Sequence, residues 1–229
     1  MQPAELLALF EGLRVADVRD GMDWAGLPSK GTVSPEIGPL FPGAKATGIA
    51  RTIRLRPSEK QVPALTPEEY TRWAYDFWYG ELYGIPLVGD LQPGEIVIVE
   101  SAGLDLGEIG SNNSLEWFAA GATGVVTSGG VRDRDECTMQ KFPIFCAYPA
   151  QKMVQGRAEY DTTQVPVSIG GALIRPGDIV VADGDGVIAV PAEHAPVVAK
   201  YARQELENDK VGRRRIYEKL GWPLDDSVR

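Results

Sequence analysis

Two segments of the sequence are near-copies of one another, and they constrain the fold more than any other feature. Residues 91–100 and 174–183 each carry an early Pro-Gly pair, then an apolar run, and each ends in a carboxylate. A Pro-Gly pair is typical of a turn, and a short apolar run after a turn is typical of a buried strand. The pattern predicts two equivalent strands and indicates structural pseudo-repetition.

Other segments predict helices and a further strand. Apolar residues at helical spacing favour a helix over residues 4–14, and loose alternation favours a strand over residues 47–55. Residues 193–220 have a helical pattern that ends at Gly221, with Pro223 just beyond. Together these elements predict an α/β fold in which helices pack outside mixed sheets.

Length and composition favour a single compact domain, residues 1–229, and exclude several classes of function. A chain of 229 residues can bury one sizeable core, and its 44% hydrophobic and 24% charged residues are ordinary values. The net charge of −9 and the pI near 4.8 argue against a nucleic-acid partner. The short basic cluster at residues 213–215 is interpreted as a solvated helix face.

The sequence also predicts where the protein works. No apolar run reaches the ~20 residues of a membrane span, so we expect no membrane partner. The first residues lack the basic and apolar regions of a secretory signal, which predicts a cytoplasmic location. Cys137 and Cys146 do not form a disulfide framework or a Cys-x-x-Cys metal motif, so they are predicted to be buried thiols.

Residues 124–136 are the strongest candidate for a functional site. An apolar run predicts a buried strand, the glycines at 129 and 130 break it, and Arg132 and Asp133 follow at once. A guanidinium can hold a carboxylate by two hydrogen bonds, and a carboxylate is a hard ligand suited to Mg²⁺ or Mn²⁺. The alternative is a surface salt bridge within a turn.

The segment Gly110, Ser111, Asn112, Asn113 and Ser114 precedes a predicted helix at residues 115–120. The first turn of a helix offers free N–H groups and the positive end of the helix dipole, which together favour an anion. Serine and asparagine are also common helix caps, so this segment is either an anion cradle or a cap.

A third notable segment is rich in aromatic residues. Thr66, Pro67 and Glu69 predict a helix start with a capping box, and a stripe of Tyr70, Trp73 and Phe77 follows. We favour packing of this helical insertion, near residues 66–84, against the core or a neighbouring subunit. The alternative is a substrate wall that, with Asp76 and Glu81, recognises a polyhydroxylated molecule.

Four motifs in order resemble the RraA-like family, which includes regulators of ribonuclease activity and divalent-metal-dependent 4-hydroxy-4-methyl-2-oxoglutarate aldolases. They are residues 15–20, 93–100, 129–145 and 177–191. The resemblance covers most of the chain, and it implies a compact β/β/α sandwich related to the swivelling phosphohistidine domains. The C-terminal end of the domain is expected to be a helical tail near residues 193–220.

The resemblance also implies roles for individual residues. Asp133 would bind the metal and Arg132 would hold the keto acid, so these two are the candidate catalytic residues. Gly110, Ser111, Asn112 and Asn113, with Arg132, would bind the substrate. Ser111 departs from the family, whose aldolases carry there an acid that helps to hold metal-bound water.

Other acids could complete the metal site. Glu108 lies three residues before Ser111 and is a further candidate ligand. The family also places an acid of a neighbouring chain near the metal, and Glu205 or Glu207 matches it, through water. This implies a homo-oligomer, either a trimer or a hexamer.

We therefore predict a metal-dependent carbon–carbon lyase that uses Mg²⁺ or Mn²⁺ and acts on a small 2-oxo acid. It would release pyruvate by retro-aldol cleavage, decarboxylate oxaloacetate, or both, and its substrate could derive from a sugar acid. The alternative is a non-catalytic, protein-binding regulator of ribonuclease activity. That branch of the family typically departs from the Arg-Asp pair, whereas this chain keeps it.

Overall fold

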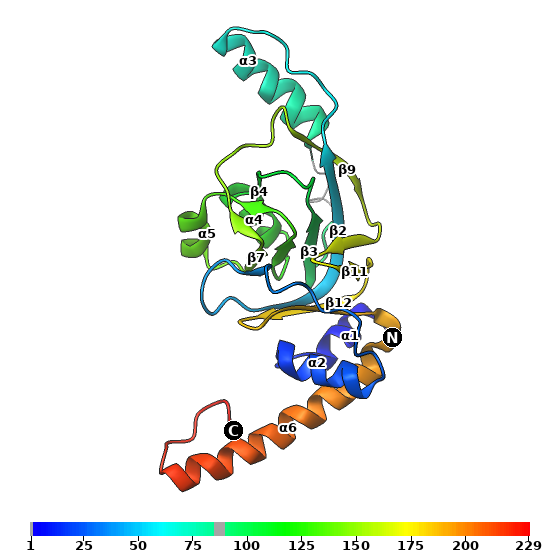
Figure 1. Cartoon of the computed structure of the whole chain (residues 1–229), viewed down its shortest axis with the longest axis vertical. Coiled ribbons are helices and arrows are strands. Elements are labelled where there is room, and N and C mark those ends of the chain that lie inside the picture. The colour runs from blue at the N-terminus through cyan, green and yellow to red at the C-terminus, as the bar shows by residue number, and fades with distance from the viewer. Residues whose placement is uncertain (1, 85–89) are drawn as a thin grey trace.

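The structure is a computed structural model that describes residues 2–84 and 90–229. A long strand, β2 (Ala46–Pro57), runs through the middle of the molecule (Figure 1). It pairs in parallel with β3 (Glu95–Glu100) on one side. On the other side it pairs antiparallel first with β12 (Ile179–Asp183) and then with β9 (Ala158–Thr163). Strand β2 therefore joins all parts of the main sheet.

The main sheet has the order β1-β7-β5-β3-β2-β12-β13, with β9 attached to β2. Its remaining strands are β1 (Gly38–Pro39), β5 (Val125–Thr127), β7 (Ile144–Cys146) and β13 (Gly186–Val190). A bridge between Thr32 and Ile188 ties the segment ahead of β1 to β13 at the far edge. The sheet therefore almost closes on itself.

Two smaller sheets accompany it. Strands β4 (Gly107–Ile109), β6 (Gly130–Val131) and β8 (Tyr148–Pro149) form a short parallel sheet. Strands β10 (Val167–Ile169) and β11 (Ala172–Ile174) form a hairpin.

The helices lie in two groups: in the view of Figure 1 one group is below the sheet, and the other is above it and beside it. The first group is α1 (Pro3–Leu9), α2 (Val15–Trp24), a 3₁₀ turn (Ala192–His194) and the long α6 (Ala195–Leu220). The second is α3 (Pro67–Trp73) with a π-helix (Ala74–Leu82), α4 (Ser111–Ala119) and α5 (Arg134–Gln140). None of the helices in the described residues is both long and apolar enough to cross a bilayer.

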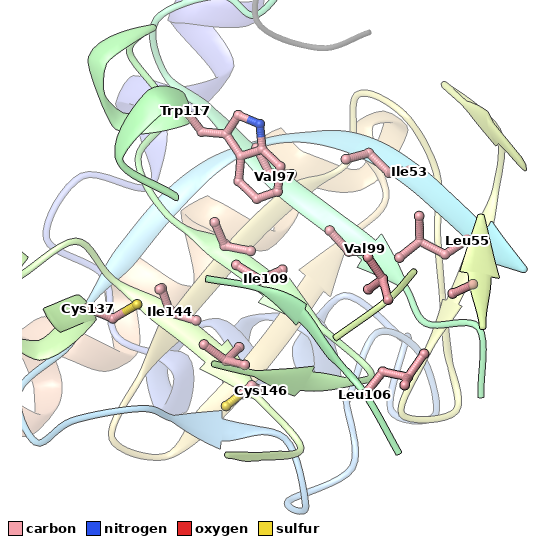
Figure 2. Close-up of a cluster of buried hydrophobic side chains, with 14 of the residues drawn as sticks. Ile53, Leu55, Val97, Val99, Leu106, Ile109, Trp117, Cys137, Ile144 and Cys146 are labelled. Carbon is pink, nitrogen blue, oxygen red and sulfur yellow. The ribbon is translucent and has the colours of Figure 1, made fainter. Parts of the chain in front are cut away.

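The buried side chains form three clusters around the sheet. One lies under α2 and α6, a second lies between the sheet and the β10–β11 hairpin, and the third lies on the side of α4. Figure 2 shows the third cluster, which includes Trp117 of α4, drawn beside Val97, and strand residues such as Val99 and Ile144.

The two near-copies adopt the same local structure, as predicted. Their glycines, Gly94 and Gly177, both have φ of 90°, which is the left-handed conformation that glycine tolerates. The next acid closes each turn in the same way: Glu95 accepts from the amide of Gln92 at 2.8 Å, and Asp178 accepts from the amide of Arg175 at 2.8 Å. The strands that follow are β3 and β12, which flank β2 on its two sides.

Most of the predicted helix boundaries are confirmed. Thr66 and Glu69 form the reciprocal capping box, and Gly221 ends α6 in a left-handed conformation. The single helix expected over residues 4–14 is wrong at its end, because α1 stops at Leu9. Gly12 has φ of 73° and lets the chain turn into α2.

The contact between α2 and α6 depends on the small size of Gly21. A Cβ atom on Gly21 would lie 2.5 Å from the carbonyl oxygen of Val198 and 2.8 Å from the amide nitrogen of Ala202. We expect Gly21→Ala to lower the free energy of unfolding by about 1–3 kcal/mol, because the two helices must separate. Denaturant titration measures this.

The matched control is Gly212→Ala on α6, where nothing lies within 4 Å of the added Cβ. Here alanine should stabilise the helix by about 0.5–1 kcal/mol. If both substitutions have the same effect, close helix packing at Gly21 is not what selects glycine.

Candidate functional site

The loop that carries Arg132 and Asp133 is held by close backbone contacts. A Cβ atom on Gly129 would lie 2.3 Å from Oε2 of Glu108, and one on Gly130 would lie 2.4 Å from the carbonyl oxygen of Leu106. The amide of Arg132 then donates to the carbonyl of Ile109 at 2.8 Å. The paired glycines therefore let β6 lie directly against β4.

Asp133 connects the two halves of the site. Its backbone is left-handed, with φ of 56° and ψ of 41°, which is unfavourable for a residue other than glycine and is often found at functional positions. Its Oδ2 atom accepts from both the amide and the hydroxyl of Ser111 at 3.1 Å. The carboxylate of Asp133 thus lies at the N-terminus of α4, where the helix dipole favours a negative charge.

The side chain of Arg132 is available to a ligand. Its aliphatic part packs over Gly107, where a Cβ would lie 1.8 Å from Arg132 Cγ. Within residues 2–84 and 90–229 its guanidinium forms neither an ion pair nor a hydrogen bond, so the alternative of a surface salt bridge is not observed. Burial raises the pKa of the nearby Tyr79, and the charge of Arg132 opposes that shift.

Helix α4 begins at Ser111, so residues 111–114, which were expected to precede the helix, form its first turn. Gly110 is its N-cap, and the amide of Gly110 donates to Oδ1 of Asn113 at 2.7 Å. The amide of Ser111 is occupied by Asp133, so it is not part of a substrate cradle. The amides of Asn112 and Asn113 have no acceptor within the described part of the chain and remain for an anionic ligand.

These elements surround a pocket of about 420 Å³, a size typical of small-molecule sites. It brings together residues that are distant in sequence, from the π-helix, β4, α4 and the start of α5. The lining residues are Tyr79, Tyr83, Gly107, Glu108, Gly110, Asn112, Asn113, Glu116, Trp117, Arg132, Asp133 and Val154. The predicted residues Gly110, Asn112, Asn113, Arg132 and Asp133 are all among them, and Ser111 contacts the pocket through Asp133.

Glu108 also lines the pocket, but its carboxyl group is engaged inside the protein. The residue is 3% exposed. Its Oε1 atom accepts from the hydroxyl of Ser101 and the amide of Ala102, each at 2.9 Å, while Oε2 has no partner among the described residues. Burial is the main cause that raises the pKa of this carboxyl group.

The candidate metal ligands do not form a cluster within one chain. Among the described residues there is no group of three or more His, Cys, Asp and Glu side chains that could hold an ion. Glu207 pairs with Lys210 on α6, and Glu205 lies near Asp20 on α2. Neither glutamate lines the pocket of its own chain.

The aromatic segment packs in the core, and two of its residues also line the pocket. Trp78 and Tyr83 are both buried in the core. Tyr83 also lines the pocket, together with Tyr79. Asp76 and Glu81 do not line it, and Glu116 of α4 is the additional acid there. The sequence indicated Tyr79 and Tyr83 only as members of the aromatic segment, and it did not indicate Glu116, Trp117 or Val154 as site residues.

The two cysteines take no part in this pocket. Both are buried free thiols, as predicted. Burial raises the pKa of Cys146 to about 11, so its thiol stays protonated and unreactive near neutral pH.

The fold is an α/β fold, and its pocket is lined by one free guanidinium, that of Arg132, and by the exposed carboxylates of Asp133 and Glu116. The model of the RraA-like family, described as "Aldolase/RraA", matches residues 15–189. The chain belongs to this family.

Two curated relatives illustrate the similarity of this chain to other proteins. The chain is 29% identical over 135 residues to a putative 4-hydroxy-4-methyl-2-oxoglutarate aldolase of Halalkalibacterium halodurans, a match that covers 57% of this chain and 62% of the relative. It is 26% identical to the protein DlpA of Legionella pneumophila, over 90% of this chain and 29% of the relative. The chain thus spans less than two thirds of the length of these curated relatives.

A solved structure confirms the fold. RraAS2 of Streptomyces coelicolor, described as an unusual member of the RNase ES inhibitor RraA family, superposes with a TM-score of 0.75 at 25% identity, over 92% of this chain and 98% of that one. The predicted α/β class is confirmed, and the family contains relatives with an aldolase name and relatives with a regulator name.

The raised pKa of Glu108 predicts a pH dependence of stability. A carboxyl group whose folded pKa is raised stabilises the fold at low pH, and this contribution is lost as the pH rises through the folded pKa. Glu108→Gln removes this pH-dependent loss of stability, because glutamine does not ionise. We expect its melting temperature, relative to wild type, to increase from about pH 5 to about pH 8.

Thermal denaturation across this range tests the expectation. Tyr83 and Tyr148 lie beside Glu108, but burial raises the pKa of both phenols, so they do not titrate in this range. A constant difference between variant and wild type would mean that Glu108 ionises normally in the folded protein.

Proposed function

We propose that this protein is a divalent-metal-dependent carbon–carbon lyase that acts on a 2-oxo acid. The observation that carries the proposal is the free guanidinium of Arg132 beside the exposed carboxylate of Asp133, at one pocket with the unused amides of Asn112 and Asn113. The aldolase name of several relatives supports it.

The pocket fits a Mg²⁺ or Mn²⁺ ion better than a metal that needs several protein ligands. Asp133 offers a hard oxygen ligand, and no nitrogen or sulfur ligand lines the pocket. Magnesium is often held by only one or two carboxylates together with water and substrate oxygens. The bound ion would act as a Lewis acid that draws electron density from the 2-oxo group.

The residues of the chain then have distinct tasks in a retro-aldol reaction. The amides of Asn112 and Asn113 orient the substrate carboxylate. The C3–C4 bond breaks, the hydroxyl at C4 loses its proton and becomes a carbonyl, and the electron pair of the bond passes to C3. Arg132 stabilises the negative charge that develops on the C2 oxygen. Protonation at C3 gives pyruvate.

The lining has no histidine or lysine for proton transfer, so the proton would move through water or through the exposed carboxylate of Glu116. The same activation of the 2-oxo group supports decarboxylation of oxaloacetate, since loss of CO₂ also leaves the electron pair at C3. In this mechanism one carboxylate would hold the ion and one guanidinium would stabilise the developing charge. No catalytic triad is required.

The second candidate is a non-catalytic regulator of ribonuclease activity, which the name of the Streptomyces relative supports. Under that alternative the pocket would be unrelated to activity. The unpaired Arg132 and the left-handed Asp133 favour the enzyme, because a protein-binding surface requires neither.

We also propose that the working form is a trimer or hexamer in which Glu205 or Glu207 of a neighbouring chain approaches the metal through water. The exposed apolar side chains of α6 support this proposal, since Val211 is 72% and Ile216 is 52% exposed. Under this proposal the protein would be a lyase only when assembled.

A substrate panel tests the function. Wild-type protein with Mg²⁺ or Mn²⁺ should release pyruvate from 4-hydroxy-2-oxo acids or from oxaloacetate, and a chelator should abolish this release. Asp133→Asn keeps the size and the left-handed backbone but removes the charge, so both turnover and calorimetric Mn²⁺ binding should be lost. The control is Asp76→Asn, an exposed acid outside the pocket. Equal Mn²⁺ affinity of wild type and Asp133→Asn contradicts the metal site.

Arg132→Lys tests whether the guanidinium acts on the transition state. Lysine keeps the positive charge but loses the planar fork. We expect kcat to fall by about 100-fold, as on loss of an oxyanion donor, with Mn²⁺ affinity unchanged. If KM rises while kcat holds, Arg132 only anchors the substrate. A lower melting temperature with full activity would indicate a structural role.

A further inference from the structure

The lining of the pocket is unbalanced in charge. Arg132 is its only cationic side chain, and Asp133 and Glu116 add exposed carboxylates. Glu116 lies on α4 one helical turn after Asn112, so it faces the same opening as the two free amides. A substrate carboxylate finds Arg132 and these amides, but a second carboxylate elsewhere on the substrate would approach Glu116.

The aromatic residues of the lining offer rings and not hydroxyl groups. The hydroxyl of Tyr79 bonds to Oε1 of Gln155 at 3.0 Å, and the hydroxyl of Tyr83 donates to the carbonyl of Glu108 at 2.7 Å. Both phenols are therefore already satisfied by the protein. Their rings remain for contact with C–H groups, and Tyr79 is only half-buried, which leaves its ring accessible.

The polar groups near these rings suit hydroxyl groups. The exposed carboxylate of Glu116 accepts hydrogen bonds, and the exposed amide of Asn112 both accepts and donates them. An uncharged chain with C–H groups on one side and hydroxyl groups on the other would satisfy the rings and the polar groups together. A purely apolar tail would form no hydrogen bonds with Glu116 and Asn112 and would displace water that solvates these exposed groups.

We infer that the substrate has one carboxylate and an uncharged, hydroxylated carbon chain, as in 2-oxo acids made from sugar acids, and that Tyr79 and Glu116 select it. This inference rests on the proposed function for the reaction, but not for the binding. Tyr79 contacts the chain, and Glu116 accepts from its hydroxyls and repels a second carboxylate. Dicarboxylic acids would then be poor ligands, both the 4-hydroxy-4-methyl-2-oxoglutarate named for several relatives and oxaloacetate, so this inference favours the retro-aldol reaction over decarboxylation.

Stable ligands with matched carbon chains test the selection directly. Gluconate and glucarate differ only at the last carbon, which is a primary alcohol in one and a carboxylate in the other, and lactate has no tail. Calorimetry with Mn²⁺ should show gluconate binding about 10-fold more tightly than glucarate, because like charges repel across a partly solvated pocket. Gluconate should also bind about 10-fold more tightly than lactate, through its tail.

The variants separate the two selecting residues. Glu116→Gln should reduce the preference for gluconate over glucarate to less than about threefold, since the repulsion is gone. Glu81→Gln is the matched control, because Glu81 is an exposed acid of the π-helix outside the pocket, and it should change nothing. Tyr79→Ala should remove the advantage of gluconate over lactate, whereas Tyr79→Phe keeps the ring and should retain it.

Some results would overturn the inference. One is that glucarate binds to the wild-type protein as tightly as gluconate does. Another is that Glu116→Gln leaves the preference for gluconate over glucarate unchanged. Melting curves confirm that each variant is folded, and if Tyr79→Ala does not fold, Glu116→Gln and Tyr79→Phe still decide the question.

A separate measurement distinguishes failure of the proposed reaction. Exchange of the pyruvate methyl hydrogens with deuterium in heavy water, followed by NMR, needs no tail. If no exchange occurs but the binding preferences are as expected, the proposed lyase is refuted and the inferred ligand class stands. If exchange occurs but the binding preferences are absent, the lyase is supported and the inferred ligand class is refuted.

Discussion

The contact between Asp133 and Ser111 is the interaction on which the rest of the site depends. Asp133 follows β6 and Ser111 follows β4, and the two hydrogen bonds to Oδ2 join the ends of these neighbouring strands. The contact fixes the direction of α4, whose remaining free amides open into the pocket, and it fixes the start of α5. It also explains why serine can occupy position 111: a carboxylate there would face the carboxylate of Asp133, whereas a hydroxyl group donates to it.

The fold was predictable wherever local chemistry decides the conformation. The Pro-Gly turns, the capping box at Thr66 and the glycine stop at 221 all depend on neighbouring residues, and the sequence shows these directly. The break after α1 was missed, because apolar spacing continues through it. The π-helix was missed as well, since its hydrogen bonds from residue i+5 to residue i have no distinct sequence pattern.

The site was predictable only in its local half. The residues at 110–113 and 132–133 could be identified because a glycine-rich turn and a helix start carry recognisable polar groups, and these groups meet in one pocket. Tyr79 and Glu116 could not be identified, because each looks like an ordinary surface residue of a helix. Tyr79 comes close to Arg132 because Trp78 Nε1 donates to the carbonyl of Ala158 and holds the aromatic segment beside the pocket, whereas Glu116 comes close through α4.

The π-helix has a consequence for the evolution of this pocket. In an α-helix each residue advances the side chain by about 100° around the axis, so the number of residues in the segment decides which of them faces inward. Removal of one residue between Trp73 and Tyr79 would bring Gly80 to the position of Tyr79, so the pocket would lose the ring with no change in the loop of Arg132 and Asp133. Relatives with the same Arg-Asp pair could thus diverge in the molecules they accept through changes in segment length alone.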